Sequence, residues 1–215
     1  AVIGLINVHG FVHAWKAKST DGIISIIAFV CTLIFAPHLD KGIMVGVVLS
    51  LLVFLYKVMR PTFAVLARHE DQAFRCAETH GLRECEYITL IRFDAPLFFV
   101  NANFLEDQVT ERMRAKKNLK HIVIAANGIN DMDASGEETL SLLVDRIRSA
   151  GLDVSLSGVN EAVMNVMQRT HLDAKIGKDH LYPTMQQAIE AIHPATHRDT
   201  TEPECPLTTV CYLPR

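Results

Sequence analysis

The segment HIVIAANGINDMDASGEETL, residues 121–140, carries the pattern that decides the fold of the second half of this chain. It begins with a continuous apolar run, His121–Ala126, as expected of a strand that is covered on both faces of a sheet. The loop Asn127–Ala134 follows, and a helix is expected from about Ser135 to Ala150. A buried strand that passes through a loop into a helix is typical of an α/β unit.

The start of this helix has a capping signature of its own. In Ser135-Gly136-Glu137-Glu138, Ser135 fits the N-cap and Glu138 the N3 position of a capping box. Gly151 is suited to the C-terminal end of the helix. The apolar stripe that should face the core consists of Leu140, Leu143, Val144 and Ile147.

Strands and amphipathic helices alternate on both sides of this segment. The expected strands are Tyr87–Arg92, Leu97–Val100 and Val154–Ser157, and the expected helices are Phe104–Lys116, Asn160–Thr170 and a last helix capped by Thr184. This order predicts an α/β domain over residues 85–195, with a mixed, partly parallel sheet and flanking helices. Residues 66–84 are expected to be a linker, and the tail 196–215, rich in Pro, Thr and Glu, is expected to be disordered.

Two uncharged apolar stretches, Gly22–Leu39 and Gly42–Tyr56, precede this domain. Each is short against the about 20 residues that a helix needs to cross a bilayer. Together they are hard to bury in a soluble protein, because two adjacent all-apolar helices leave little polar face for water. We therefore expect transmembrane helices at about 22–39 and 42–59, with close helix contact at the Gly42–Gly46 GxxxG match.

A further uncharged segment, Ala1–Trp15, resembles the end of another membrane helix, so residues 1–65 form an α-helical transmembrane part. Because the sequence begins inside an apolar run without Met, we interpret it as a piece of a longer polypeptide. Membrane helices of this kind imply the lipid bilayer as a partner.

The charges around the apolar stretches predict their orientation. Lys16 and Lys18 precede the expected hairpin and Lys57 and Arg60 follow it, whereas Lys41 lies at the opposite end. Positive charge is concentrated on the cytoplasmic side of membrane proteins, so the α/β domain is expected in the cytoplasm.

Composition excludes some function classes. Residues 66–215 contain sixteen Lys and Arg against twenty-two Asp and Glu. Nucleic-acid binding depends on clustered positive charge, so no nucleic-acid partner is expected. The five cysteines (Cys31, Cys76, Cys85, Cys205 and Cys211) are odd in number and lack CxxC spacing, which favours reduced thiols without a disulfide or a metal.

The candidate site is the loop Asn130–Gly136, at the carboxyl end of the apolar strand and the start of a helix. Its candidate residues are Asn130, Asp131, Asp133, Ser135 and Gly136. Helix N-termini can bind anions, but the two aspartates place negative charge beside the same amides. Two interpretations stay open: a capped turn in which Asp133 bonds local amides, or a surface for regulation or partner docking.

No catalytic set is apparent, so we do not expect an enzyme or a cofactor. Ser135 has no apparent base beside it, and two aspartates in a short loop are too few for a divalent cation. The histidines of the second half lack ligand spacing with cysteine or acidic partners; they are His171, His180, His193 and His197.

Three motifs resemble one family. Asp133–Leu140 (DASGEETL) is similar to the D-[ST]-[ST]-G-x-x-x-L signature of STAS domains, the fold of anti-sigma factor antagonists. Arg92–Phe104 (RFDAPLFFVNANF) resembles the RFDGPLFFANANYF segment of STAS domains attached to SulP-type anion transporters. Gly46–Leu52, with Arg60-Pro61 after it, is similar to the final membrane helix of those transporters.

The resemblance implies a secondary active transporter for sulfate or another inorganic anion such as bicarbonate. It further implies a dimeric multi-pass protein of the cell inner (plasma) membrane, whose cytoplasmic STAS domain serves dimerisation or regulation. The substrate-binding residues of the family lie upstream of this sequence, so none is named here.

One position departs from the family's relatives. In the sigma-antagonist proteins the residue after the loop Asp is a phosphorylated Ser, whereas here it is Ala134 and Ser135 follows. An alternative is therefore a membrane-tethered signalling module whose loop docks a kinase or another protein. Nucleotide binding by the loop is a third interpretation.

Overall fold

The computed structural model describes residues 12–13, 15–16, 19–35, 39–198 and 204–213. The chain divides into two compact units, Ala1–Val58 and Met59–Arg215. Most of the expected segment 1–15 lies outside the described residues.

The described residues of the first unit include the helices α2 (Ser19–Ile34) and α3 (Leu39–Met59), in place of the expected spans 22–39 and 42–59. Within the described residues, one helix is long and apolar enough to cross a membrane. It is α3 over Asp40–Met59, with a mean hydropathy of 2.2 and only 6% of its apolar window buried. The apolar part of α2, Gly22–Ile34, is shorter.

The GxxxG match marks a contact between these two helices. A Cβ atom added at Gly42 would lie 2.6 Å from the Cα of Thr32, and one at Gly46 would lie 3.4 Å from the Cβ of Ala28. The backbones approach most closely at Gly42, where no side chain fits. The predicted close contact at this motif is confirmed.

The second unit is built on a six-stranded sheet in the order β2-β1-β3-β4-β5-β6. The strands are β1 (Thr62–Arg68), β2 (Phe74–Cys76), β3 (Ile88–Asp94), β4 (His121–Ala125), β5 (Asp153–Ser157) and β6 (Leu181–Tyr182). β1 pairs antiparallel with β2 and β3, and the pairs from β3 to β6 are parallel. The predicted α/β class with a mixed sheet is confirmed.

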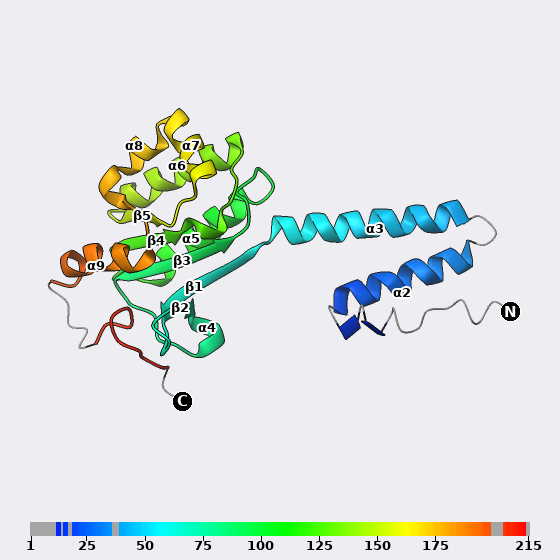
Figure 1. The fold of residues 1–215 in the computed structure, drawn as a ribbon, viewed down its shortest axis with the longest axis horizontal. Helices are drawn as coiled ribbons and strands as arrows, with labels where there is room; N and C mark the ends of the chain where they lie inside the picture. Colours follow the sequence, from blue (N-terminus) through cyan, green and yellow to red (C-terminus); the bar gives the residue numbers. More distant parts are fainter. Residues whose placement is uncertain (1–11, 14, 17–18, 36–38, 199–203, 214–215) are drawn as a thin grey trace. The chain divides into compact units, whose positions relative to one another are not determined.

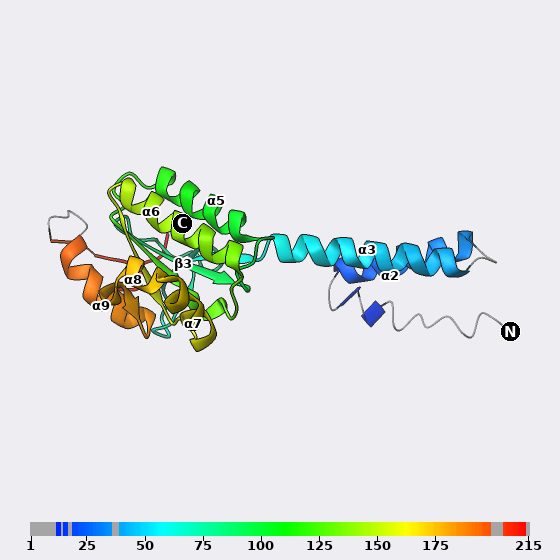
Figure 2. The same ribbon diagram turned by 90° about the horizontal axis from the view of Figure 1, so that it is seen from above.

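Helices cover both faces of this sheet (Figures 1 and 2). They are α4 (Ala77–His80), α5 (Ala102–Ala115), α6 (Ala134–Ser149), α7 (Glu161–Thr170), α8 (Leu172–Ile176), α9 (Met185–Thr196) and the 3₁₀ turns η2 (Ala126–Gly128) and η3 (Lys178–His180). Helices α5 to α8 pack on one face and α9 on the other.

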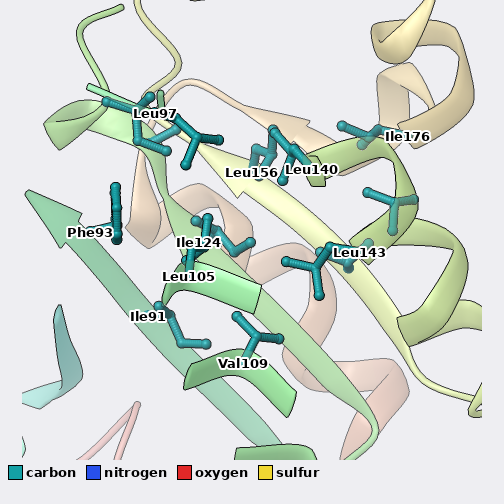
Figure 3. Close-up of a cluster of buried hydrophobic side chains, with 14 of the residues drawn as sticks. Ile91, Phe93, Leu97, Leu105, Val109, Ile124, Leu140, Leu143, Leu156 and Ile176 are labelled. Carbon is teal, nitrogen blue, oxygen red and sulfur yellow. The ribbon is translucent and has the colours of Figure 1, made fainter. Parts of the chain in front are cut away.

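The larger core lies between the sheet and α5 to α8. Figure 3 shows Ile91 and Phe93 of β3 against Leu105 and Val109 of α5, all of them buried. The predicted stripe of α6 is buried here as well: Leu140, Leu143, Val144 and Ile147. Successive residues of β4 point to opposite faces of the sheet. Ile122 and Ile124 are buried in this core, and Val123 is buried in a second core, between the sheet and α9.

Residues 66–84 are not a linker in the structure. The end of β1, all of β2 and α4 occupy this stretch, and the second unit begins at Met59. Ala64–Ala67 are buried, with Ala64 and Leu66 in the core beside α9 and Ala67 beside α4, and β1 pairs with β2 and β3 at its two edges. The strand therefore depends on pairing partners rather than on an alternating pattern of its own.

Two further expectations are wrong. Leu97–Val100 is not a strand, because only Leu97 forms an isolated bridge, to Met132, and the next residues turn into α5. The tail is not disordered over residues 204–213, since Cys205 and Leu207 are buried in the core beside α9.

Candidate functional site

Residues 129–133 connect η2 to α6 at the carboxyl end of β4; together with the first residues of α6, up to Gly136, they are called the loop 129–136 below. Ile129 is buried, and its carbonyl accepts a 2.7 Å hydrogen bond from Asn160 Nδ2. Asn160 is also the N-cap of α7, so one side chain links the loop to a second helix. The loop is thereby held where the strand leaves the sheet.

A second loop, residues 95–101, is hydrogen bonded to the first. The Leu97 amide donates to the Asp131 carbonyl at 2.9 Å, and the Asp133 amide donates to the Leu97 carbonyl at 3.2 Å. A Cβ atom at Gly136 would lie 2.1 Å from that same Leu97 carbonyl oxygen. Only glycine fits there, which explains the Gly of the motif in steric terms.

Asp133 is the N-cap of α6. Its Oδ1 accepts from the Gly136 amide at 2.7 Å, and its Oδ2 accepts from the Phe99 amide at 2.9 Å. The capping box with Ser135 as N-cap and Glu138 at N3 is therefore wrong, because the N-cap lies two residues earlier, at Asp133, and the helix begins at Ala134. The alternative in which Asp133 bonds local amides is confirmed.

The Asp133 cap limits which ligands the N-terminus of α6 can bind. The Asp133 carboxylate already occupies the first-turn amide of Gly136 and brings a negative charge to the positive end of α6. Asp131 is exposed beside it, with its Oδ1 accepting from the Met132 amide at 2.8 Å. Binding of a further anion here is disfavoured by both carboxylates.

The exposed part of the site is a small mixed surface. Asn130, Asp131 and Ser135 are exposed, whereas Gly136 is buried. Phe99 lies on the adjoining loop with 72% of its surface exposed, a residue that the sequence analysis assigned to a strand. Its position follows from Asn101, whose side chain accepts from the Phe98 amide at 3.0 Å and turns the chain.

A second polar cluster consists of two cysteines and a histidine that lie far apart in the sequence. One ligand atom from each of Cys85, His197 and Cys205 lies within 4.8 Å of the others. The expectation that these histidines lack cysteine partners is therefore wrong for His197. No spacing rule could have found the group, since Cys85 and His197 are 112 positions apart.

A third cluster lies at the amino ends of β4 and β5. His121 Nε2 is 2.9 Å from Ser155 Oγ, which is 3.1 Å from His180 Nδ1, and His180 Nε2 is 3.4 Å from Asp153 Oδ2. Burial lowers the pKa of His121 to about 4, although Asp153 acts in the opposite direction. His121 is therefore a neutral core residue at pH 7.

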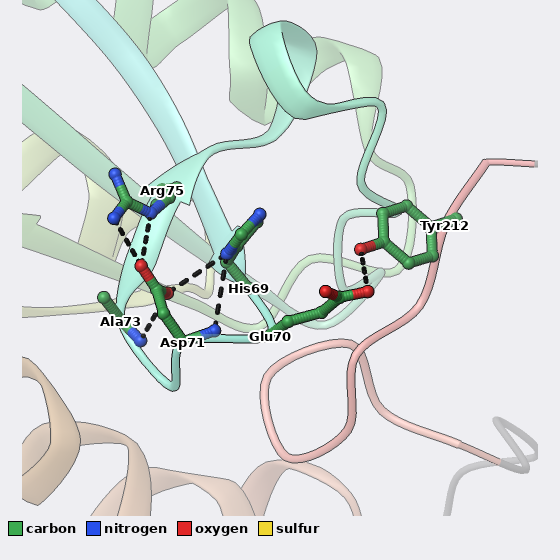
Figure 4. A network of polar contacts seen from close by, with 6 residues as sticks. All are labelled: His69, Glu70, Asp71, Ala73, Arg75 and Tyr212. Carbon is green, nitrogen blue, oxygen red and sulfur yellow. Dashed lines mark hydrogen bonds and ion pairs between the residues drawn. The ribbon is translucent and has the colours of Figure 1, made fainter.

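The turn between β1 and β2 contacts the end of the chain. In Figure 4, Asp71 accepts from Arg75 and from the Ala73 amide, and Tyr212 donates to Glu70 at 2.7 Å. The hydrogen bonds from Arg75 hold the pKa of Asp71 well below its ordinary value. The turn is thus linked to the C-terminal segment 204–213 by the hydrogen bond of Tyr212.

Comparisons with known proteins agree with this architecture. The family model of the STAS domain matches residues 80–188. The chain is 26% identical to Sulfate transporter 3.1 of Arabidopsis thaliana, over 94% of this chain and 32% of the transporter. It is 22% identical to High affinity sulfate transporter 2 of Stylosanthes hamata, over 91% of this chain and 31% of that protein. The chain therefore spans about a third of the length of these relatives.

A solved structure shows the same fold. It is the murine Solute Carrier 26 family member A9 anion transporter in the inward-facing state, with a TM-score of 0.72 and 18% identity. The match covers 87% of this chain and 31% of the transporter.

Proposed function

This chain belongs to the STAS-domain family, and from that premise we propose that it is the C-terminal part of a SulP-type secondary transporter for an inorganic anion. Sulfate is the first candidate substrate, because the curated relatives with which it aligns over nine-tenths of its length are named sulfate transporters. Those relatives are transporters and not enzymes, and the chain shares their class.

One observation carries the proposal. The apolar helix α3, with 6% of its apolar window buried, ends at Met59, and the first strand of the STAS unit begins at Thr62. A soluble protein would cover most of such a helix. An exposed apolar helix followed directly by a STAS unit supports a membrane transporter with an attached regulatory domain.

The orientation and assembly are part of the same proposal. Lys16, Lys57 and Arg60 on one side of the hairpin support a STAS unit in the cytoplasm, below the inner (plasma) membrane. The STAS unit would support homodimerisation or regulation of transport. The anion site would lie in upstream helices, since transporters of this kind bind substrate near the bilayer midplane at half-helix ends.

Reconstitution tests the transport function. The full-length gene product in liposomes should take up labelled sulfate or bicarbonate, and the present 215 residues alone should not. Failure of the full-length protein to transport every inorganic anion tried would refute the proposal.

A second candidate function is partner docking through the loop 129–136. The exposed Phe99 beside Asn130 and Ser135 favours it, because an exposed aromatic with polar neighbours is typical of a protein contact. A kinase or another signalling protein is the expected partner. Incubation with a cognate kinase should place phosphate on Ser135, and the Ser135→Ala variant should remain unlabelled; labelling of that variant to the same extent would refute this function.

A further inference from the structure

Three segments of the second unit converge on one buried point. Cys85 precedes β3, His197 follows the last turn of α9, and Cys205 lies in the C-terminal segment. Cys85 Sγ is 3.3 Å from His197 Nε2, and the three ligand atoms lie within 4.8 Å of one another. Zinc bonds to sulfur and nitrogen place the ligand atoms of a tetrahedral site about 3.4–3.8 Å apart. The cluster is therefore close to the size that zinc requires.

His193 is the candidate for a fourth ligand, beside the group of three whose ligand atoms lie within 4.8 Å of one another. It lies one turn before His197 on the same face of α9, and the two rings are stacked at 3.9 Å with an interplanar angle of 14°. Its Nε2 is buried, and the described residues offer that atom no hydrogen-bond partner of regular geometry. A pair of histidines in H-x3-H spacing is a frequent half of a Cys2His2 zinc site.

Backbone amides are directed at the sulfur of each cysteine. The amides of Tyr87 and Ile88, two and three residues after Cys85, point at its sulfur at 3.4 and 3.3 Å. The amide of Leu207, two residues after Cys205, bonds that sulfur in the same manner. Hydrogen bonds from backbone amides stabilise a negatively charged sulfur and orient it toward a metal.

His197 is held in the tautomer that a metal needs. Its Nδ1 lies 2.9 Å from Thr196 Oγ1 and 3.3 Å from the His193 carbonyl oxygen. Because a carbonyl only accepts hydrogen bonds, Nδ1 carries the proton and Nε2 presents its lone pair toward Cys85. Such a partner on the other ring nitrogen is typical of metal-bound histidine.

We propose that Cys85, His193, His197 and Cys205 form a structural zinc site that fastens the C-terminal segment 204–213 to the STAS unit. Two thiolates and two imidazoles in a buried tetrahedral group suit zinc rather than magnesium or calcium, which take oxygen ligands. All four positions are filled by protein, so the site is closed to substrate.

The C-terminal segment 204–213 also forms backbone hydrogen bonds with residues 81–83. The Arg83 amide donates to the Cys211 carbonyl at 2.8 Å, and the Leu213 amide donates to the Gly81 carbonyl at 2.8 Å. Zinc bound to Cys205 would hold the start of this segment against α9 and Cys85, so that these contacts form together. The site does not depend on anion transport, and its test is separate from the transport test.

Metal titration of the whole 215-residue chain tests the proposal. The chain is purified in detergent with a reductant, stripped with a chelator and titrated with Co²⁺ and then Zn²⁺. We expect visible bands of tetrahedral cobalt, a thiolate-to-cobalt charge-transfer band, loss of both on addition of zinc, and stoichiometric zinc by mass spectrometry of the metal content.

Variants identify the ligands. Cys85→Ser and Cys205→Ser should abolish the charge-transfer band, and His193→Gln and His197→Gln should weaken binding by at least about tenfold. Cys211→Ser is the matched control, since it removes a cysteine of the same segment outside the cluster and should leave the titration unchanged. Far-UV circular dichroism of each variant separates loss of a ligand from loss of the fold.

Hydrogen exchange gives an independent measurement on the unsubstituted chain. Zinc should slow exchange of the Arg83 and Leu213 amides, which bond the C-terminal segment. Absence of a cobalt spectrum in the unsubstituted chain, an unchanged spectrum in the folded Cys85→Ser and His197→Gln variants, or a Cys85–Cys205 disulfide in place of metal under reductant would each overturn the proposal.

Discussion

Replacement of Asp133 by alanine tests the central contact of the loop 129–136. The substitution removes an N-cap, which costs about 1 kcal/mol, and a charge-assisted hydrogen bond to the Phe99 amide, which contributes about 1.5 kcal/mol or more. The side chain is half-buried, so solvent compensates part of the loss. We expect the Asp133→Ala variant to lower the free energy of unfolding by about 2–3 kcal/mol.

Two companion variants separate the contributions. Asp133→Asn keeps an oxygen for the Gly136 amide but presents an NH2 group to the Phe99 amide, so it should cost about 1–2 kcal/mol. Ser135→Ala should change stability by less than about 0.5 kcal/mol, because Ser135 is exposed and is not the cap.

The assay is urea unfolding of residues 59–215, followed by circular dichroism, with the midpoint shift compared at an unchanged slope. Exchange of the Phe99 amide should rise in both Asp133 variants and not in Ser135→Ala. If Ser135→Ala were the costly substitution and Asp133→Ala the silent one, the capping box read from the sequence would be right and the reasoning from the structure refuted.

Three other predictions concern stability. Gly136→Ala should lower the free energy of unfolding by about 3 kcal/mol or more in the same urea assay, because its Cβ would lie 2.1 Å from the Leu97 carbonyl oxygen. The control Gly81→Ala, at a residue with φ +61° and open space around it, should lower it by only about 1 kcal/mol. An equal loss of stability in both variants would contradict the steric argument. The contribution of His121 to the free energy of unfolding should be constant above about pH 6.5 and fall below it, by up to about 3 kcal/mol as the pH reaches 4, because the pKa of buried His121 is lowered to about 4 and unfolding lets it take up a proton at higher pH. His121→Asn should flatten this part of the pH profile, and an unchanged slope in that variant would show that another group is responsible. Gly42→Leu should separate α2 from α3 and lower the thermal stability of the detergent-solubilised chain, whereas Gly46→Ala, at an ordinary 3.4 Å contact, should not.

Elements that depend on neighbours in the sequence could be predicted from it. The run His121–Ala126 and the stripe of α6 have patterns that only a buried strand and an amphipathic helix satisfy, and both are present. The predicted cap Thr184 is confirmed as well, since its hydroxyl accepts from the amide of Gln187, three residues on. The interactions involved are local, so the local sequence contains the information.

The cap of α6 shows where local reasoning ends. Ser135 and Asp133 are both acceptable N-caps by residue type. Asp133 is the N-cap of α6 because the fold places the Phe99 amide, 34 positions upstream, beside the second oxygen of its carboxylate. The sequence of residues 130–138 contains no sign of this contact with the Phe99 amide.

Contacts between distant segments account for the remaining differences. The strand β1 exists because β2 and β3 pair with its two edges, and Cys205 meets Cys85 only after the chain has passed through the whole sheet and α9. Hydrophobic periodicity and turn chemistry act over a few residues, so they establish the α/β class, the apolar helices and the loop at the end of β4. Strand pairing, close approaches between backbones and clusters of ligands join residues that are far apart in the sequence. They form only when long loops close, so the tertiary structure decides them.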